Sequence, residues 1–280
     1  MFSIQGKLIG KANPLLMGIV NLTDDSFYSG SRYPDLQAAL QIASEMVAQG
    51  AEIIDVGAIS TRPGARLIDA NFERKKLMPV IREIRKHLPN SILSVDTYRS
   101  EIAKEVLDEG VDIINDISGG LFDPQMPVII GRHNAPYVMM HIHRTPSDMQ
   151  QFPIDEGVVE IVKDFFTRQV ALFESFGANR ILLDPGFGFG KTIRANYELL
   201  ARFDELSVNG YPLLAGLSRK SMIYRTLEIS PEEALNGTSA LNLVALLKGA
   251  SVLRVHDIRQ ACEIRKLHWQ LSTSCHSQPK

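Results

Sequence analysis

Eight short apolar runs recur along the chain, and most of them end in a polar residue. The runs cover residues 15–21, 52–57, 92–97, 113–118, 137–142, 181–186, 213–218 and 252–257. Their hydrophobicity is continuous rather than alternating, which is typical of strands that are buried on both faces of a parallel sheet. The sequence therefore predicts about eight buried strands, each of which needs a covering layer.

Segments with helical periodicity lie between these runs. Residues 36–50 repeat apolar positions every three or four residues and end at Gly50, which is suited to terminate a helix. Residues 100–110 open with Ser100 as an N-cap and end at a glycine, and residues 233–249 precede the last run. Alternating strands and helices imply parallel strands, and eight such units close into a (β/α)8 barrel. An open doubly wound sheet is the alternative, and the number of strands argues against it.

A single barrel fits the length of 280 residues, and no shift in composition marks a linker. We predict a small hairpin or extension at residues 1–14, a barrel of α/β class at residues 15–270 and a flexible tail at residues 271–280.

The composition argues against several classes of protein. The net charge is −2, so any anion site must be a local basic cluster, and no nucleic-acid partner is expected. Cys262 and Cys275 show no pattern of a disulfide framework or zinc site. Neither a secretory leader nor an apolar run of membrane-spanning length is evident, which favours a globular cytoplasmic protein without a membrane partner.

One glycine-rich stretch, ILLDPGFGFGKT at residues 181–192, resembles a phosphate-binding loop. The P-loop pattern needs a glycine at position 185, where this chain has Pro185. The dinucleotide pattern also fails, because Lys191 occupies the position of its third glycine. We therefore interpret the stretch as a tight turn after a strand that ends at Asp184, with glycines that allow another molecule to approach closely.

Polar residues gather at the predicted strand ends, where barrel enzymes place their reactive groups. They are Asn21, Asp55, Asp96, Thr97, Asn115, Asp116, His141, Asp184, Ser218, Arg219, Lys220, Arg254 and His256. Asp96, Asn115 and Asp184 suit a flat heterocycle with a guanidine-like edge, because a carboxylate accepts two parallel hydrogen bonds. The basic residues near the last two strands form a positive arc that suits a phosphate or diphosphate.

Structural roles explain some of these residues equally well. A single aspartate at a strand end often only caps the next helix, and Asp116 fits that description. Barrel packing is the simpler interpretation of Met139 and Met140, and His141 is as well suited to a structural role as to ligand binding. The structural interpretation does not account for so many acids, amides and bases at one rim.

The ordered motifs resemble those of the dihydropteroate synthases, the folate-pathway family that sulfonamides inhibit. The resembling stretches include MGIVNLTDDSF, STRPGA, SVDTYRSEIA, DPGFGFGKT, SRKS and RVHD, and they run from about residue 15 to residue 258. The resemblance implies a homodimeric (β/α)8 barrel. It also implies a reaction that joins 6-hydroxymethyl-7,8-dihydropterin diphosphate to p-aminobenzoate and releases diphosphate.

The resemblance also implies residue roles. Asp96, Asn115, Asp184 and Lys220 would hold the pterin, and Arg254 would stack on it and meet the diphosphate together with His256. Asn21 would be a ligand of Mg²⁺ on the diphosphate. The p-aminobenzoate would meet Thr61, Arg62, Pro63, Phe189 and Ser218, and the remaining candidate pocket residues are Met139, Gly188 and Arg219.

Several positions depart from the family pattern. Asp24 replaces a proline in the first loop, and Ser29 stands where an acid is usual, so Asp24 is our candidate for that acid's catalytic role. Ala58 and Ile59 replace glycine and glutamate, and Arg144 replaces a glycine. Two alternatives therefore stay open, a corrinoid-linked pterin methyltransferase and a pterin-binding barrel without catalytic activity.

Overall fold

The barrel is built from eight parallel strands of the described chain. The computed structural model describes residues 2–10, 12–22, 34–58 and 69–274. The barrel strands are β3 (Leu15–Asn21), β4 (Ile53–Gly57), β5 (Ile92–Asp96), β6 (Ile113–Asp116), β7 (Tyr137–Met140), β8 (Ile181–Asp184), β9 (Leu213–Ala215) and β10 (Ala250–Val255). They follow one another around the barrel in chain order, and β10 closes the ring by pairing with β3. The predicted (β/α)8 barrel is confirmed.

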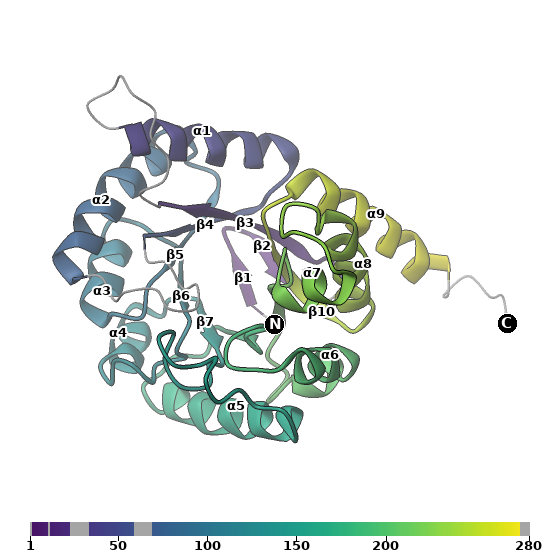
Figure 1. Cartoon of the computed structure of the whole chain (residues 1–280). Helices are drawn as coiled ribbons and strands as arrows, with labels where there is room; N and C mark the ends of the chain where they lie inside the picture. Colours follow the sequence, from purple (N-terminus) through teal and green to yellow (C-terminus); the bar gives the residue numbers. More distant parts are fainter. Residues whose placement is uncertain (1, 11, 23–33, 59–68, 275–280) are drawn as a thin grey trace, which may run out of the picture.

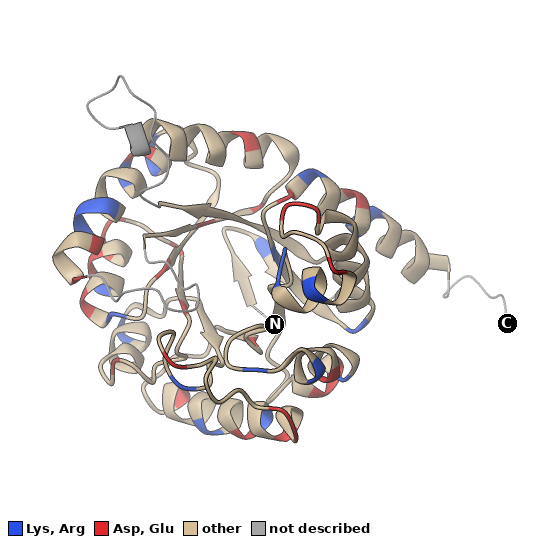
Figure 2. Cartoon of the chain, in the orientation of Figure 1, with Lys and Arg blue, Asp and Glu red and all other residues tan. Residues whose placement is uncertain are grey.

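Helices surround this ring, as Figure 1 shows in a view along the barrel. They are α1 (Pro34–Gln49), α2 (Ala70–His87), α3 (Ser100–Asp108), α4 (Met126–His133), α5 (Val158–Ser175), α6 (Ile193–Ala201), α7 (Ser221–Leu227), α8 (Leu235–Leu247) and α9 (Ile258–Ser274), with a 3-10 turn at Phe203–Leu206. Most of the lysine, arginine, aspartate and glutamate positions lie on this outer ring (Figure 2). Within the described chain, none of these helices combines the length and apolarity that crossing a membrane requires.

An N-terminal hairpin closes one end of the barrel. Strands β1 (Phe2–Ile4) and β2 (Lys7–Ile9) pair antiparallel, as the sequence predicted. Ile4 and Ile9 are buried against the inward-facing apolar residues of the barrel strands, among them Leu15 and Val252. The hairpin therefore seals the amino-terminal end of the barrel, and the carboxyl ends of the strands remain as the open mouth.

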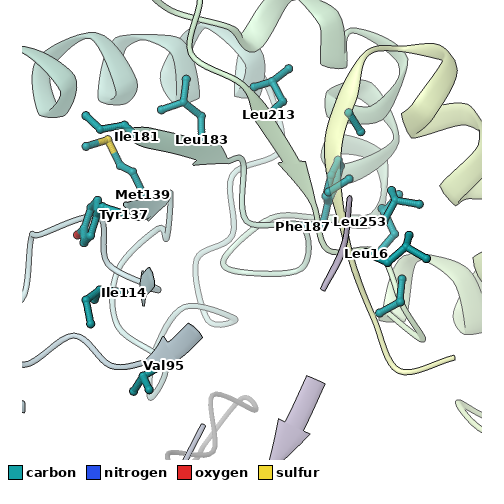
Figure 3. Close-up of a cluster of buried hydrophobic side chains, with 14 of the residues drawn as sticks. Leu16, Val95, Ile114, Tyr137, Met139, Ile181, Leu183, Phe187, Leu213 and Leu253 are labelled. Carbon is teal, nitrogen blue, oxygen red and sulfur yellow. The ribbon is translucent and has the colours of Figure 1, made fainter. Parts of the chain in front are cut away.

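Strand register decides which side chains face inward. Asn115 on β6 pairs with Val138 on β7, and Asp116 pairs with Met139. Val138 belongs to the inner apolar layer, whereas Met139 belongs to the cluster between strands and helices that Figure 3 shows. Because side chains alternate along a strand, Asn115 shares the inner face and Asp116 the outer face.

The last helix differs from the sequence-based boundary. Helix α9 continues through Ser274, beyond the domain end predicted at residue 270. Its inner side packs through Ile258 and Ala261, which are buried. The helix is therefore continuous across the first four residues of the predicted flexible tail.

Candidate active site

A polar layer lies above the inner apolar layer, at the mouth of the barrel. Its members come from strands whose inward positions switch from aliphatic to polar residues near their carboxyl ends: Asp55, Ser94, Asp96, Asn115, Asp184 and Arg254. All except Arg254 are buried, and Arg254 is largely covered. Polar groups in such surroundings need hydrogen-bond partners, so their pairing shows which of them are available to a ligand.

Asp55 is the centre of this layer. Its Oδ1 accepts a hydrogen bond from Ser94 Oγ at 2.6 Å, and its Oδ2 accepts one from Asn115 Nδ2 at 2.9 Å. The guanidinium of Arg254 donates to the same Oδ2 through Nε at 2.7 Å. Both carboxylate oxygens are therefore committed within the protein.

Other polar atoms in the mouth have no hydrogen-bond partner among the described residues. They are Asn115 Oδ1, Asp184 Oδ2, Asp96 Oδ1 and the ammonium of Lys220. Asp184 uses its Oδ1 to accept the Gly186 N–H at 2.8 Å, and Asp96 meets Arg254 only at 3.4 Å. The mouth thus presents three acceptor atoms and one ammonium that no hydrogen bond within the described chain satisfies.

Burial alters the protonation of two of these groups. It raises the pKa of Asp96 to about 8, and the nearby charge of Arg254 opposes that rise. It lowers the pKa of Lys220 to about 8, with further lowering by repulsion from Arg254 and an opposing effect of Asp184. Both groups therefore titrate within reach of neutral pH, which is common at functional sites.

Lys220 and the glycine-rich loop are in direct contact. The Lys220 ammonium lies 4.3 Å from the ring centroid of Phe189, a favourable cation–π geometry. Gly188 has a φ of 83°, and a Cβ there would lie in van der Waals contact with the Lys220 side chain, at 3.4 Å from its Cδ. The two predicted pocket residues on this loop, Gly188 and Phe189, therefore shape the space around Lys220.

Lys191 binds backbone carbonyl groups around the glycine-rich loop. Its buried ammonium donates to the carbonyl oxygens of Gly186 at 2.9 Å, Phe189 at 3.1 Å and His141 at 3.3 Å. Burial lowers the pKa of Lys191 to about 7, and the charge of Asp184 opposes this. Gly186 lies at φ 66°, and a Cβ there would collide with the His141 carbonyl. The glycines and Lys191 therefore pack the loop against the segment that follows β7.

Ser218 and His256 pair at the far side of the mouth. Ser218 Oγ lies 2.9 Å from His256 Nδ1 and accepts the His256 backbone N–H at 3.3 Å. Partial burial and the positive charge of Arg254 lower the pKa of His256 to about 4. The Ser218 oxygen already accepts the backbone N–H, so the Ser218 hydroxyl can donate its proton to His256 Nδ1. A ring that accepts at Nδ1 is the neutral tautomer with its hydrogen on Nε2.

Arg219 is not among the available cations. Its guanidinium binds Asp257 through Nε at 3.1 Å and Nη2 at 2.9 Å, and Nη1 donates to the Glu232 carbonyl. The backbone of Arg219 is left-handed, at φ 54°, which turns its side chain onto this partner while Lys220 stays unpaired. The predicted arc is thus reduced to Lys220, Arg254 and His256.

Met139 packs in the barrel wall, as the simpler interpretation has it, and does not take the pocket role. Its side chain is fully buried in the outer cluster between strands and helices, so it does not line the mouth. Met140 faces inward instead and packs with Phe189, Tyr98 and Ile117. The physical reason is the alternation of side chains along β7, which one register step reverses.

Asp116 has a structural role, but it holds the loop after β6 and does not cap the next helix, which begins at Met126. Its carboxylate accepts hydrogen bonds from Tyr137 Oη at 2.6 Å and from the Ser118 and Gly120 backbone at 2.7 and 3.0 Å. His141 also lies outside the mouth, with its ring against the edge of Phe165 at 5.0 Å. Arg144, which replaces a family glycine, has φ 65°, a conformation that glycine adopts without strain.

Asn21 is the candidate ligand of the metal ion. Asn21 ends β3 on the inner face and is exposed. In the described residues, no three histidine, cysteine, aspartate or glutamate side chains gather into a metal-binding group. Mg²⁺ commonly keeps several waters and takes few protein ligands when substrate phosphates supply the others, so a single amide oxygen fits such an ion.

Some predicted residues lie outside the described chain, and some functional candidates were missed. Asp24, Ser29, Ile59, Thr61, Arg62 and Pro63 fall in residues 23–33 and 59–68. The sequence pattern places Asp55 among the polar strand ends but does not indicate its central role. It rejects Lys191 as a nucleotide ligand but does not predict its structural role. The signal available for Asp55 was its place in an otherwise aliphatic run, where a buried charge needs partners.

Comparison with known proteins identifies relatives over nearly the whole chain. A dihydropteroate synthase from Synechocystis is 40% identical over 261 residues, covering 91% of this chain and 90% of the relative. The crystal structure of the Clostridium difficile dihydropteroate synthase in the presence of pteroic acid has a TM-score of 0.87 and 36% identity, and the match covers 97% and 99% of the two chains. The Yersinia pestis dihydropteroate synthase in complex with a sulfonamide drug has a TM-score of 0.90 and 34% identity, with the same coverage.

A family model described as pterin binding enzyme matches residues 17–256. The chain therefore belongs to the pterin-binding enzymes and, with its curated relatives, to the dihydropteroate synthases, which are transferases of folate synthesis.

Proposed function

We propose that the mouth of this barrel condenses 6-hydroxymethyl-7,8-dihydropterin diphosphate with p-aminobenzoate to give 7,8-dihydropteroate and diphosphate. The observation that carries this proposal is the set of unsatisfied groups, three acceptors and one ammonium, at a single rim. A dihydropterin offers a complementary edge, with N–H donors along one side and a carbonyl oxygen beside them. Pteroic acid, in the presence of which the structure of a relative was determined, is a pterin joined to p-aminobenzoate.

The acceptors would bind the ring in the order in which their strands lie. Asp184 on β8, Asn115 on β6 and Asp96 on β5 follow one another around the barrel. Asp184 would take the N3–H and one hydrogen of the 2-amino group, whose other hydrogen would meet Asn115 Oδ1. Asp96 would meet the opposite end of the ring. Lys220 would donate to the carbonyl oxygen. Charge-assisted hydrogen bonds of this kind are about twice as strong as neutral ones.

The diphosphate would lie against the positive side of the mouth. Arg254 and the Nε2–H of His256 are the donors there, and Ser218 holds the His256 ring in place. Asn21 would hold Mg²⁺ on the diphosphate. When bound, this ion would neutralise charge on the leaving group.

The chemistry then requires no strong base. The carbon–oxygen bond to the diphosphate breaks with its electron pair on oxygen, and the electron-rich dihydropterin stabilises the positive methylene carbon. The free arylamine forms the new carbon–nitrogen bond and afterwards loses a proton to water. Phe189 and Ser218, with Thr61, Arg62 and Pro63 of the second loop, would position the p-aminobenzoate and exclude competing water.

A diphosphate-release assay tests this proposal against the non-catalytic alternative. Purified protein and the pterin diphosphate are incubated with and without p-aminobenzoate, and release is followed by a coupled enzyme. We expect release that depends on p-aminobenzoate and is inhibited by a sulfonamide. Pterin binding without release in either condition would establish a binding barrel. The corrinoid-linked methyltransferase is not favoured, because the curated relatives are dihydropteroate synthases.

Three further expectations belong to this proposal. A homodimer and a cytoplasmic location follow from the family resemblance and from the sequence, and both stay predictions. Gel filtration with light scattering tests the first. Sulfonamides should compete with p-aminobenzoate, as the drug complex of a structural relative suggests.

A further inference from the structure

We propose that Asp55 is a positioning residue that sets the orientation of the Asn115 amide and thereby selects a ring that carries a 2-amino group over one that carries a 2-oxo group. This inference rests on the proposed pterin site and assigns a specificity role to a residue that does not meet the ligand.

The hydrogen bonds of Asp55 leave Asn115 a single orientation. Asp55 is fully buried, and its Oδ2 lies 2.9 Å from Asn115 Nδ2. A carboxylate only accepts hydrogen bonds, and the amide oxygen of Asn115 in that place would bring two acceptors together. The Nδ2 group must therefore face Asp55.

The same contact determines what Asn115 offers to the mouth. Its Oδ1 has no partner among the described residues and lies on the inner face, between the strands that carry Asp184 and Asp96. All three positions then present acceptors to the ring. An amino group at position 2 of the ring donates a hydrogen bond to these acceptors. An oxo group at position 2 would place a second acceptor against a buried acceptor.

Asp55 also fixes Arg254. The Arg254 Nε and Nη2 both lie 2.7 Å from Asp55 Oδ2, whereas Asp96 is 3.4 Å away. Asp55 is thus the principal partner of Arg254, and the carboxyl group of Asp96 stays available to the ring. A single buried carboxylate holds the amide and the guanidinium on the two sides of the mouth.

The chain offers a matched set of variants. In Asp55→Ala, the amide of Asn115 is free to turn. In Asp55→Asn, the new side-chain oxygen can accept hydrogen bonds from Asn115 and Arg254, and the new amide nitrogen can donate to Ser94 Oγ. The orientation of the Asn115 amide is therefore retained. Ser94→Ala removes only the partner of Oδ1. Asp55→Ser serves in place of Asp55→Ala if the latter does not fold by circular dichroism.

The readout is the ratio of affinities for pterin and for the 2,4-dioxopteridine, measured by calorimetry on each full-length variant. We expect Asp55→Ala to reduce this ratio by at least about tenfold, because a hydrogen bond to a fixed acceptor is lost. Asp55→Asn and Ser94→Ala should keep the ratio within about threefold of the wild type.

The outcomes separate the two proposals. A folded Asp55→Ala or Asp55→Ser variant with the wild-type ratio would overturn the positioning role. Wild-type protein that binds pterin selectively but releases no diphosphate would overturn the proposed reaction and leave the role of Asp55 standing. Wild-type protein that does not prefer pterin would overturn this inference outright.

Discussion

The ammonium of Lys191 lies 2.9 Å from the carbonyl oxygen of Gly186, within the loop whose sequence resembles a phosphate-binding motif. The same ammonium also meets the carbonyls of Phe189 and His141. A lysine that binds three backbone carbonyls has no hydrogen left to donate to a phosphate. The contact explains how a loop with glycine, lysine and threonine serves a purpose other than nucleotide binding.

Replacing Lys191 tests this role. Lys191→Met should lower the free energy of unfolding by about 2 kcal/mol, because buried carbonyls lose their donor. The melting temperature should fall by roughly 4–8 °C for a chain of this size. Lys163→Met, on the exposed side of α5, is the control and should stay within about 0.5 kcal/mol of the wild type. Millimolar ATP that stabilises the wild type but not Lys191→Met would instead establish a nucleotide site.

Asp184→Asn should weaken pterin binding without unfolding the barrel. The new Oδ1 can still accept the Gly186 N–H, but the acceptor that faces the mouth becomes a donor. We expect a loss of about 10- to 100-fold in affinity by calorimetry, from one charge-assisted pair. Near-wild-type affinity in a folded variant would remove Asp184 from the ring site.

The pH dependence of kcat/KM should report Lys220. Its pKa is lowered to about 8, so the ammonium is present below that pH and is lost above it. The value of kcat/KM for the pterin diphosphate should therefore fall about tenfold per pH unit above pH ~8. Lys220→Arg should remove this alkaline limb, because arginine stays charged.

Asp96 is the necessary control for that profile, because its pKa is also about 8. Asp96→Asn should retain the alkaline limb at a lower rate if Lys220 is the titrating group. A limb that persists in Lys220→Arg and vanishes in Asp96→Asn would assign it to Asp96.

The first loop supplies a prediction that depends on sequence alone. Ser29 stands where the resembling family has an acid, and Asp24 is a nearby substitute. If an acid at position 29 assists the cationic intermediate, Ser29→Asp should raise kcat by roughly tenfold, equal to about 1.4 kcal/mol. If Asp24 already serves, Ser29→Asp should bring no gain and Asp24→Pro should lower kcat. Unchanged kcat in both variants would leave the loop with a closing role only.

The sequence by itself determined the architecture and most of the rim. Continuous apolar runs are local properties, because a strand buried on both faces needs apolar residues at most of its positions. Their polar ends then follow from the barrel rule, which is why Asp96, Asn115, Asp184 and Lys220 were found without coordinates. The N-terminal hairpin was predicted in the same way, from a short segment outside the repeated units.

Only the tertiary structure decided how neighbouring residues divide their roles. Met139 and Met140 are equally apolar, and the register of β7 turns one outward and the other into the mouth. Arg219 and Lys220 are both basic, and Asp257, 38 positions along the chain, removes Arg219 from the site. Asp55 and Arg254 meet across 199 positions, because closure of the barrel brings β4 and β10 to either side of β3. Such pairings depend on distances between strands, and no local pattern of residues encodes them.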